Sequence, residues 1–299
     1  MGELGGVLAV DKPPGVTSFD VVQAVRRALG VRRVGHAGTL DPFATGLLVV
    51  CVGEATKAVP FLMDGDKEYE AVVALGSETD TLDTEGVVVA EADAAHVTRE
   101  AAIEAARAFV GLVEQVPPAY SAIHQGGRRL YELARAGVAV EAPSRWVRME
   151  HITVTGFEPG RVSLRVRCGK GTYIRSLARD LGRALGTVAH LAALRRTESG
   201  AFRVAGAVSL TEVLSQGREV AGRLVPIEEA LAHLPALHLD EDTAQRVGWG
   251  QRVAVSGTSD AEATRLLDPC GRLVAVGRVH GGLVEVVRGF SAAAGGDSR

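Results

Sequence analysis

The order of apolar and polar residues near the start of the chain predicts a strand, a loop and a helix. The apolar run at residues 7–10 predicts a short strand, and residues 11–15, which include two prolines, end it. Over residues 17–30 apolar positions recur on one face of a helix, and its first residues have the spacing of a capping box. The glycine-bounded apolar run at 46–53 predicts a buried strand.

The middle of the chain continues this mixture of strands and helices. Residues 68–75 and 86–90 have the pattern of strands on either side of an acidic loop. Residues 98–110 predict an alanine-rich helix with Thr98 as its N-cap. Residues 152–155 and 162–167 flank turn residues and predict a hairpin.

Residues 172–185 have the clearest helical pattern of the chain. Apolar residues recur on one face, Thr172 stands at the N-cap position, and Gly186 follows as a stop signal. Arg175, Arg179 and Arg183 are spaced by four residues, which predicts a basic stripe along this helix. Together with the strands, the helices favour the α+β class.

Composition changes divide the chain further. Residues 117–145 are rich in proline and glycine at their start and predict a surface insertion with a short helix around 130–135. A boundary near residues 234–235 separates a first domain, 1–234, from a small, mostly β module at 235–290. Residues 291–299 have the composition of a disordered tail.

Length and composition exclude several classes of protein. The chain has 299 residues, of which 46% are hydrophobic and 23% charged, as is ordinary for a globular protein. No apolar run is long enough to span a bilayer, and the N-terminus lacks the pattern of a signal peptide. The three cysteines are far apart in the sequence, which indicates neither disulfides nor a zinc site and favours the cytoplasm.

Charge is unevenly distributed, although the net charge is only −3. Residues 64–104 contain twelve acidic residues against Lys67 and Arg99, whereas residues 128–203 contain fifteen basic residues against six acidic ones. A chain divided in this way can present a basic face to a polyanion while it stays acidic overall.

One carboxylate stands out among the residues that could carry chemistry. The sequence has no P-loop, no nucleophile elbow and no histidine spacing typical of a metal site. Asp41 lies in a segment of small residues beside the apolar run 46–53, where burial would raise its pKa unless a cation such as Arg175 paired with it. The alternative is that Asp41 only begins a turn, since Asp-Pro is a common turn dipeptide.

Six blocks, in the same order along the chain, resemble the TruB family of bacterial tRNA pseudouridine-55 synthases. Each block alone is weakly specific, but their order is highly specific, and it favours a functional Asp41 over a simple turn. The blocks are DKPPGVTS at residues 11–18, GHAGTLDP at 35–42, Lys67 to Gly86 with its Thr79-Asp80-Thr81 and Asp83, PPAYSA at 117–122, KGTYIRSL at 170–177, and LRRT at 194–197.

The resemblance implies a fold and a set of site residues. It implies a pseudouridine synthase fold, with a mixed, mainly antiparallel sheet and flanking helices, followed by a small PUA-like RNA-binding domain, and it makes residues 117–145 a thumb-like insertion. Asp41 would be the catalytic aspartate. The residues implied to bind the substrate are His36, Tyr69, Tyr173, Arg175 and Leu194, with Lys12 and Pro13 supporting the site.

The implied activity is isomerisation of uridine 55 in the T loop of tRNA after the base has been flipped out. This reaction needs no metal and no cofactor, and we expect a stand-alone monomer that binds the T stem-loop, and the acceptor end through its C-terminal domain. Three alternatives stay open: a non-catalytic RNA-binding or RNA-folding protein, a guide-RNA-dependent relative of the family, and a retaining glycosidase, which would need a pair of close carboxylates.

Overall fold

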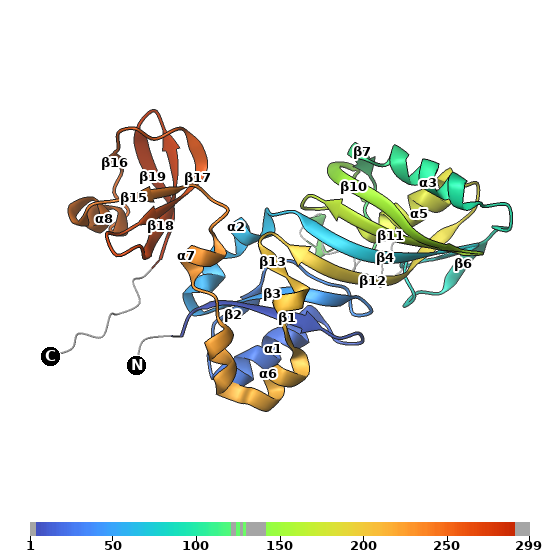
Figure 1. Ribbon diagram of the computed structural model, residues 1–299, viewed down its shortest axis with the longest axis horizontal. Helices are drawn as coiled ribbons and strands as arrows, with labels where there is room; N and C mark the ends of the chain where they lie inside the picture. The colour runs from blue at the N-terminus through green and yellow to red at the C-terminus, as the bar shows by residue number, and fades with distance from the viewer. Residues whose placement is uncertain (1–3, 121–123, 126–127, 130–141, 291–299) are drawn as a thin grey trace.

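The computed structural model describes residues 4–120, 124–125, 128–129 and 142–290. Two sheets organise this part of the chain, one of ten strands and one of five, with helices against both (Figure 1). The predicted α+β class is therefore confirmed. The predicted helix at 130–135 and the predicted tail at 291–299 lie outside the described residues.

The larger sheet is mixed and mainly antiparallel, as predicted. Its main path is β14-β1-β3-β12-β4-β11-β10-β7, with β2 beside β3 and β13 beside β12. The β1–β14 and β3–β12 pairs are parallel, and the other pairs are antiparallel. The strands are β1 (Gly6–Lys12), β2 (Val34–His36), β3 (Thr45–Val52), β4 (Lys67–Leu75), β7 (Gly111–Gln115), β10 (Arg145–Glu158), β11 (Arg161–Cys168), β12 (Ala189–Ser199), β13 (Phe202–Arg203) and β14 (Val208–Ser209).

Helices pack against this sheet in two groups. One apolar cluster joins the β4, β11 and β12 strands to α3 and α5, and another joins β1 and β3 to α1 and α6. Among the described residues no helix is long and apolar enough to cross a membrane. The helices are α1 (Ser18–Leu29), α2 (Val59–Met63), α3 (Arg99–Ala108), α5 (Ile174–Ala184), α6 (Leu210–Gln216), α7 (Ile227–Ala230) and α8 (Glu241–Gly248), with 3-10 turns η1 (Gly53–Ala58), η2 (Val204–Gly206) and η3 (Gly217–Arg223).

Helix α1 forms as the sequence predicts. The Thr17 hydroxyl accepts a hydrogen bond from the Asp20 amide, and the Asp20 carboxylate accepts one from the Thr17 amide, which completes the capping box. At the other end Gly30 adopts the left-handed conformation, with a φ of 66°. The helix packs against β1 through a shared apolar cluster, and Lys12, the last residue of β1, donates to the Pro42 carbonyl in the loop that carries Asp41.

Alternation along β4 separates the two faces of the sheet. Tyr69, Ala71 and Val73 belong to or pack against the cluster that contains α5, whereas Glu70, between them, is exposed on the opposite face. This register places the Tyr69 side chain at the end of the buried cluster, on the same side of the sheet as α5.

Charges that are separated along the chain come together in space. Five of the twelve acidic residues of segment 64–104 form ion pairs with basic residues of segment 128–203. The basic segment is therefore partly neutralised by the acidic one, and it is less available to a polyanion than the sequence suggests. These pairs are Arg148–Asp66, Arg165–Glu70, Lys170–Asp64, Arg175–Asp83 and Arg183–Glu78.

Two predictions about α5 are wrong in detail. The N-cap residue is Tyr173 rather than Thr172, because the Thr172 hydroxyl donates to the Gly169 carbonyl and the amide of Tyr173 is bonded by Gln115 instead. The three arginines do not form an exposed basic stripe. Arg175 is buried, and Arg179 is paired with the neighbouring Asp180.

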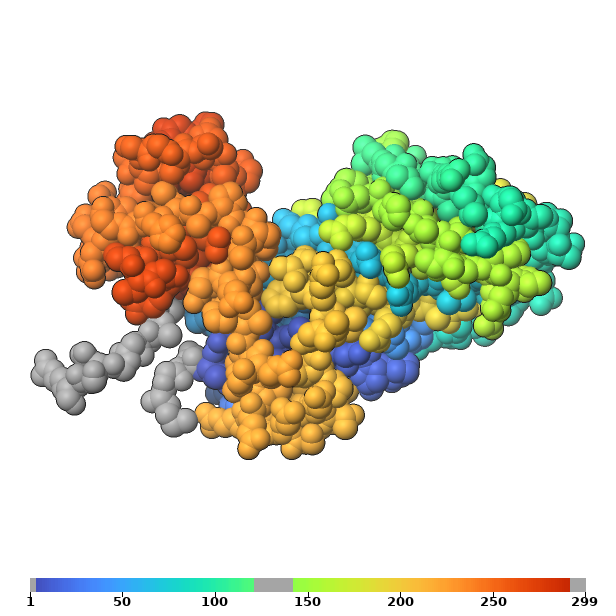
Figure 2. All heavy atoms as spheres, viewed as in Figure 1, coloured from blue at the N-terminus to red at the C-terminus, as the bar shows by residue number. Residues whose placement is uncertain are grey.

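The smaller sheet begins at Ala236, close to the predicted boundary. Its order is β15-β17-β18-β19-β16, and α8, capped by Asp240, packs on it. Figure 2 shows it as a red lobe joined to the rest by the orange chain that includes α7. The strands are β15 (Ala236–His238), β16 (Val253–Ala254), β17 (Ala261–Leu267), β18 (Leu273–His280) and β19 (Leu283–Gly289).

The two sheets share an apolar cluster. Leu273 and Phe290 of the smaller sheet belong to the same cluster of buried residues as Leu47 of β3 and Leu231 after α7. Two short two-stranded sheets complete the described structure: β5 (Ser77–Thr79) with β6 (Val88–Glu91), and β8 (His124–Gln125) with β9 (Arg128–Arg129).

Candidate active site

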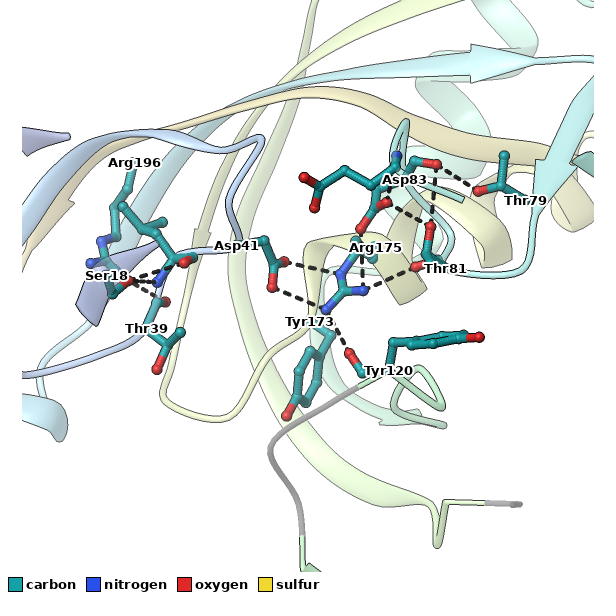
Figure 3. Close-up of polar contacts among 12 residues, drawn as sticks. Ser18, Thr39, Asp41, Thr79, Thr81, Asp83, Tyr120, Tyr173, Arg175 and Arg196 are labelled. Carbon is teal, nitrogen blue, oxygen red and sulfur yellow. Dashed lines mark hydrogen bonds and ion pairs between the residues drawn. The ribbon is translucent and has the colours of Figure 1, made fainter. Parts of the chain in front are cut away.

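Asp41 lies in the loop between β2 and β3. The backbone of Asp41 has the role of a turn residue, and its side chain is available for a functional role. Its backbone begins a turn, since the Ala44 amide donates to the Asp41 carbonyl at 3.1 Å. Its side chain points away from that turn toward Arg175 (Figure 3). The turn therefore fixes the backbone and leaves the carboxylate available for another role.

Arg175 holds the Asp41 carboxylate from the first turn of α5. Its Nε lies 3.0 Å from Asp41 Oδ2 and its Nη2 lies 3.2 Å from Asp41 Oδ1, a two-pronged contact that fixes the orientation of the carboxylate. The Arg175 side chain is 6% exposed and that of Asp41 is 33% exposed. Asp41 is thus the partner that a substrate can reach.

A second carboxylate lies on the other side of the same guanidinium. Asp83 Oδ2 is 3.2 Å from Arg175 Nη1, and the Asp83 side chain is 3% exposed. Its Oδ1 accepts hydrogen bonds from the Thr81 hydroxyl and the Glu85 amide. Figure 3 shows Arg175 between Asp41 and Asp83, with the carbonyls of Thr81 and Tyr120 accepting its remaining N–H groups.

The backbone before Asp83 is unusual for a buried apolar residue. Leu82 has a φ of 62°, in the left-handed region that disfavours residues other than glycine, asparagine and aspartate. Its amide donates to the Thr79 carbonyl and its carbonyl accepts from the Leu191 amide of β12. These bonds hold the strained conformation, which directs Asp83 toward Arg175.

Three buried polar side chains hold the Asp41 loop by its backbone. The Ser18 hydroxyl donates to the Leu40 carbonyl at 3.0 Å and accepts from the Leu40 amide at 2.9 Å. Lys12, fully buried, donates to the carbonyls of Pro13, Val16 and Pro42. On the other side of Asp41, Arg196 donates to the carbonyls of Gly38, Thr39 and Leu47.

Two glycines near Asp41 contact Arg196, Gly38 in the loop and Gly46 in β3, and each is required by its backbone geometry or by close packing. Gly38 has a φ of 107°, a conformation unsuited to other residues, and its carbonyl accepts from Arg196 Nη2 at 3.0 Å. Gly46 lies against the Arg196 backbone, and a Cβ there would approach the Arg196 carbonyl oxygen to 2.3 Å.

Burial and neighbouring charges shift the pKa values of Asp41 and Lys12 in opposite directions. Burial raises the pKa of Asp41, and the Arg175 charge opposes this rise. The N-terminus of α5, where Arg175 lies, also favours negative charge. Burial lowers the pKa of Lys12 to about 8, although the charge of Asp41 opposes this effect. Burial likewise lowers the pKa of His36.

A pocket of about 320 Å³ lies over the Asp41 carboxylate. It brings together five of the eight predicted site residues from a loop, two strands and a helix: Asp41, Tyr69, Tyr173, Arg175 and Leu194. Lys12 lies beneath it, through its bond to Pro42, and does not line it. His36, on β2, and the exposed Pro13 also lie outside the lining.

Gln115 at the end of β7 fixes the start of α5 beside this pocket. Its side-chain oxygen accepts from the Tyr173 amide at 2.8 Å, and its side-chain amide donates to the Tyr173 carbonyl at 3.0 Å. Since Tyr173 has no side-chain cap of its own, Gln115 replaces the missing cap from another strand.

Sequence reasoning did not identify Ser18, Asp83, Gln115 or Arg196 as site residues. Ser18, Asp83 and Arg196 lie inside the six blocks that resemble the TruB family, and this was the one signal that could have found them. A hydroxyl or guanidinium that bonds backbone carbonyls far along the chain produces no recognisable spacing of residues in the sequence. Gln115 lies outside the blocks and has no such signal. Among the described residues, no group of three or more His, Cys, Asp or Glu residues could hold a metal ion.

The comparisons with known proteins identify the family of the chain. The family model of the TruB pseudouridylate synthase N-terminal domain matches residues 26–174, and the model of the tRNA pseudouridylate synthase B C-terminal domain matches residues 175–232. The chain is 48% identical over 256 residues to tRNA pseudouridine synthase B of Symbiobacterium thermophilum, covering 85% of this chain and 84% of the relative. The chain belongs to the TruB family.

Other members of the TruB family match almost end to end. The tRNA pseudouridine synthase B of Thermobifida fusca is 44% identical, over 96% of this chain and 98% of the relative. The predictions of the family and of the enzyme class, a pseudouridine synthase and hence an isomerase, are confirmed. The two family models end at residue 232, before the smaller sheet begins.

Solved structures support the predicted fold. A Cbf5-Nop10-Gar1 complex contains a chain that matches with a TM-score of 0.76 at 28% identity, over 97% of this TruB chain and 85% of that chain. An H/ACA RNP bound to a substrate RNA containing 2′-deoxyuridine matches with a TM-score of 0.74 at 26% identity, over 97% and 86% of the two chains. The pseudouridine synthase fold is confirmed.

Proposed function

We propose that the protein isomerises uridine 55 in the T loop of tRNA to pseudouridine, with Asp41 as the catalytic residue. That it is a tRNA pseudouridine synthase follows from its family and from the names of its relatives. The observation that supports Asp41 is its position: it is the more exposed of two carboxylates on one buried arginine, and it lines the pocket.

The reaction exchanges one bond at the sugar for another. The N1–C1′ bond breaks, the uracil turns, C1′ joins C5, and the proton of C5 is lost while N1 gains one. The base must first leave its stack, which costs a few kcal/mol. Asp41 either attacks C1′ as a nucleophile or removes the C2′ proton, and both routes require the ionised carboxylate.

Arg175 keeps Asp41 ionised and oriented. Its fixed charge opposes the rise in the pKa of Asp41 that burial causes, and the two-pronged contact fixes the direction of the carboxylate. Asp83 in turn fixes Arg175 from the opposite side. A preorganised charge of this kind also stabilises charge that develops in the transition state.

The aromatic residues of the pocket have the chemistry for the flipped base. We propose that Tyr69 stacks on the uracil, while Tyr173 and Leu194 form the walls, since extruded bases are commonly held between aromatic and apolar side chains. His36 lies on β2, before the loop that carries Asp41, and its Nδ1 is buried without a hydrogen-bond partner among the described residues. We propose that it enters the RNA loop as the base leaves.

The partners follow from the same reaction. We propose that residues 1–234 form the catalytic domain, with 117–145 as a thumb that closes on the T stem-loop, and that 235–290 form a PUA-like domain for the acceptor end. We further propose a monomer in the cytoplasm that acts without guide RNA. Its higher identity to tRNA pseudouridine synthase B than to the chain of the Cbf5 complex supports this choice.

The test is turnover by the purified protein on an unmodified tRNA transcript, with pseudouridine mapped by chemical sequencing and no guide RNA present. We expect a single modified position, uridine 55, in the wild type. Asp41→Asn should bind the transcript with similar affinity but lose essentially all turnover, because an amide can neither attack nor accept the proton. Pseudouridine formed by a clean Asp41→Asn preparation would show that the aspartate is wrongly assigned.

The same assay separates the two roles of Asp41. With uridine deuterated at C2′, proton removal from that carbon gives a primary isotope effect on single-turnover rates, whereas attack at C1′ does not.

A further inference from the structure

Arg145 lies against a wall of the pocket without being one of its lining residues. It is the first residue of β10, and its cross-strand neighbour is Gln115 of β7, which bonds the Tyr173 backbone. The Arg145 guanidinium carbon is 4.7 Å from the centroid of the Tyr173 ring. Gln115 thus holds Tyr173 by its backbone, and Arg145 holds the Tyr173 ring in a cation–π contact.

Two nitrogen atoms of the Arg145 guanidinium group lack hydrogen-bond partners in the described part of the chain. Arg145 Nε and Nη2 are buried and have no hydrogen-bond partner within the described residues. No ion pair joins Arg145 to a carboxylate in that part of the chain, whereas Arg148, three residues further along β10, is paired with Asp66 and Glu150. Buried donors without partners are costly, so two of them on one guanidinium beside the pocket need an explanation, and an anionic ligand is one.

The other cations around the pocket already have partners. Each basic residue that lines it donates to a carboxylate or to backbone carbonyls. These residues are Lys67 with the carbonyls of Met63 and Gly65, Lys170 with Asp64, Arg175 with Asp41 and Asp83, and Arg196 with three loop carbonyls. Within the described structure, Arg145 is the cation beside the pocket for which no carboxylate or carbonyl partner is present, and its guanidinium contacts the Tyr173 ring.

We propose that Arg145 binds a backbone phosphate of the RNA next to the extruded nucleotide. The planar face of the guanidinium stays on the Tyr173 ring while its N–H edge meets two phosphate oxygens, the fork geometry that arginine and phosphate share. Stacking on Tyr173 fixes the side chain before the RNA arrives, so less conformational freedom is lost on binding. This proposal rests on the proposed function and names the substrate group that the site recognises.

The experiment measures how affinity depends on salt. A fluorescent RNA stem-loop with the T-arm sequence is titrated with wild type, Arg145→Gln, Arg145→Lys and Arg161→Gln between about 50 and 200 mM KCl, the range over which phosphate contacts change affinity strongly. Arg161 is the matched control: it is an exposed arginine on the neighbouring strand β11, at the end of that strand opposite the pocket. Thermal unfolding of each variant verifies that it is folded.

Loss of one phosphate contact predicts a defined change in the salt dependence. For Arg145→Gln the slope of log Kd against log [KCl] should become shallower by about 0.7 to 1, with weaker binding at low salt. Arg145→Lys should keep the wild-type slope, because an ammonium also binds phosphate, and Arg161→Gln should keep both slope and affinity. A wild-type slope in Arg145→Gln, or an equal change in Arg161→Gln, would overturn the proposal.

The same titration, combined with the turnover assay, distinguishes failure of the phosphate contact from failure of the proposed function. Asp41→Asn is measured in the same titration and should keep the wild-type slope while it makes no pseudouridine. If wild type makes no pseudouridine but its binding depends on Arg145, the function fails and the phosphate contact stands. If turnover falls in Arg145→Gln with an unchanged slope, Arg145 only orients Tyr173 and the phosphate contact fails.

Discussion

At the scale of single residues, the site depends on side chains that bond the backbone as much as on those that face the pocket. Asp41 occupies a loop without regular structure. The position of its carboxylate therefore depends on the hydrogen bonds that hold the backbone of Leu40, Pro42 and Gly38 in place. Ser18, Lys12 and Arg196 hold these three residues. Misplacement of a catalytic group by about 1 Å can cost as much as 100-fold in rate.

Ser18→Ala tests whether this support acts on catalysis. It removes the hydroxyl that bonds both the amide and the carbonyl of Leu40, so we expect the single-turnover rate to fall by about tenfold or more. The matched control is Thr17→Ala, which removes the capping box one residue earlier and costs about 1 kcal/mol of stability. Stopped-flow or quenched turnover at saturating RNA measures the difference. Equal losses of stability and rate in both variants would contradict a positioning role for Ser18.

The raised pKa of Asp41 predicts an acid limb in the pH profile. The carboxylate must be ionised, so the single-turnover rate should fall as pH falls through a pKa above the ordinary aspartate value. The positive charge of Lys12 lowers the pKa of Asp41, so Lys12→Met should move this limb to higher pH, besides any loss of maximal rate. Rates are measured at saturating RNA from about pH 4 to 8, around the pKa values of ordinary carboxyl groups. An acid limb that stays in place or moves to lower pH in Lys12→Met contradicts this assignment.

At the scale of elements, the sequence predicts most strands and helices but not how their ends are completed. Helix α1 was fully predictable, because its cap lies in its own residues, Thr17 and Asp20. Helix α5 was not, because the group that caps it, Gln115, is 58 residues away along the chain. The same distinction holds for the site: five predicted residues meet in one pocket, whereas Asp83 is directed to Arg175 by a left-handed Leu82 that sequence patterns do not indicate.

Gln115→Ala tests the cap supplied by β7. The substitution leaves the Tyr173 amide without a partner and removes one of the two donors to the Tyr173 carbonyl, which keeps its bond from the Leu177 amide. Each lost hydrogen bond costs roughly 0.5–1.5 kcal/mol, so the free energy of unfolding should fall by about 1–3 kcal/mol. Turnover should also fall, since the first turn of α5 carries Arg175. Urea unfolding and single-turnover assays measure the two effects.

The control for this variant is Gln216→Ala at the exposed end of α6, which should change stability by no more than about 0.5 kcal/mol. An unchanged rate in Gln115→Ala, despite lower stability, would mean that the cap stabilises α5 without placing Arg175.

At the scale of the whole molecule, the two sheets are joined by packing as well as by chain connection. Phe290 and Leu273 of the smaller sheet share a buried cluster with Leu231 and Leu62. Arg265 of β17 reinforces this junction by donating to the carbonyls of Glu228 and Leu234. A junction of this kind fixes the distance between the pocket and the smaller sheet.

Phe290→Ala tests whether the sheets unfold together. The side chain is 7% exposed, and its truncation should cost about 3–5 kcal/mol through lost burial and the cavity left behind. Because the cluster is shared, we expect one calorimetric transition in the wild type and a lower midpoint for that whole transition in Phe290→Ala. Val287→Ala, on β19, the strand that ends just before Phe290, is the control: Val287 is 46% exposed, so the midpoint should stay nearly unchanged. Two separate transitions, of which Phe290→Ala moves only one, would mean that the smaller sheet is an independent unit and that the shared cluster does not fix its position.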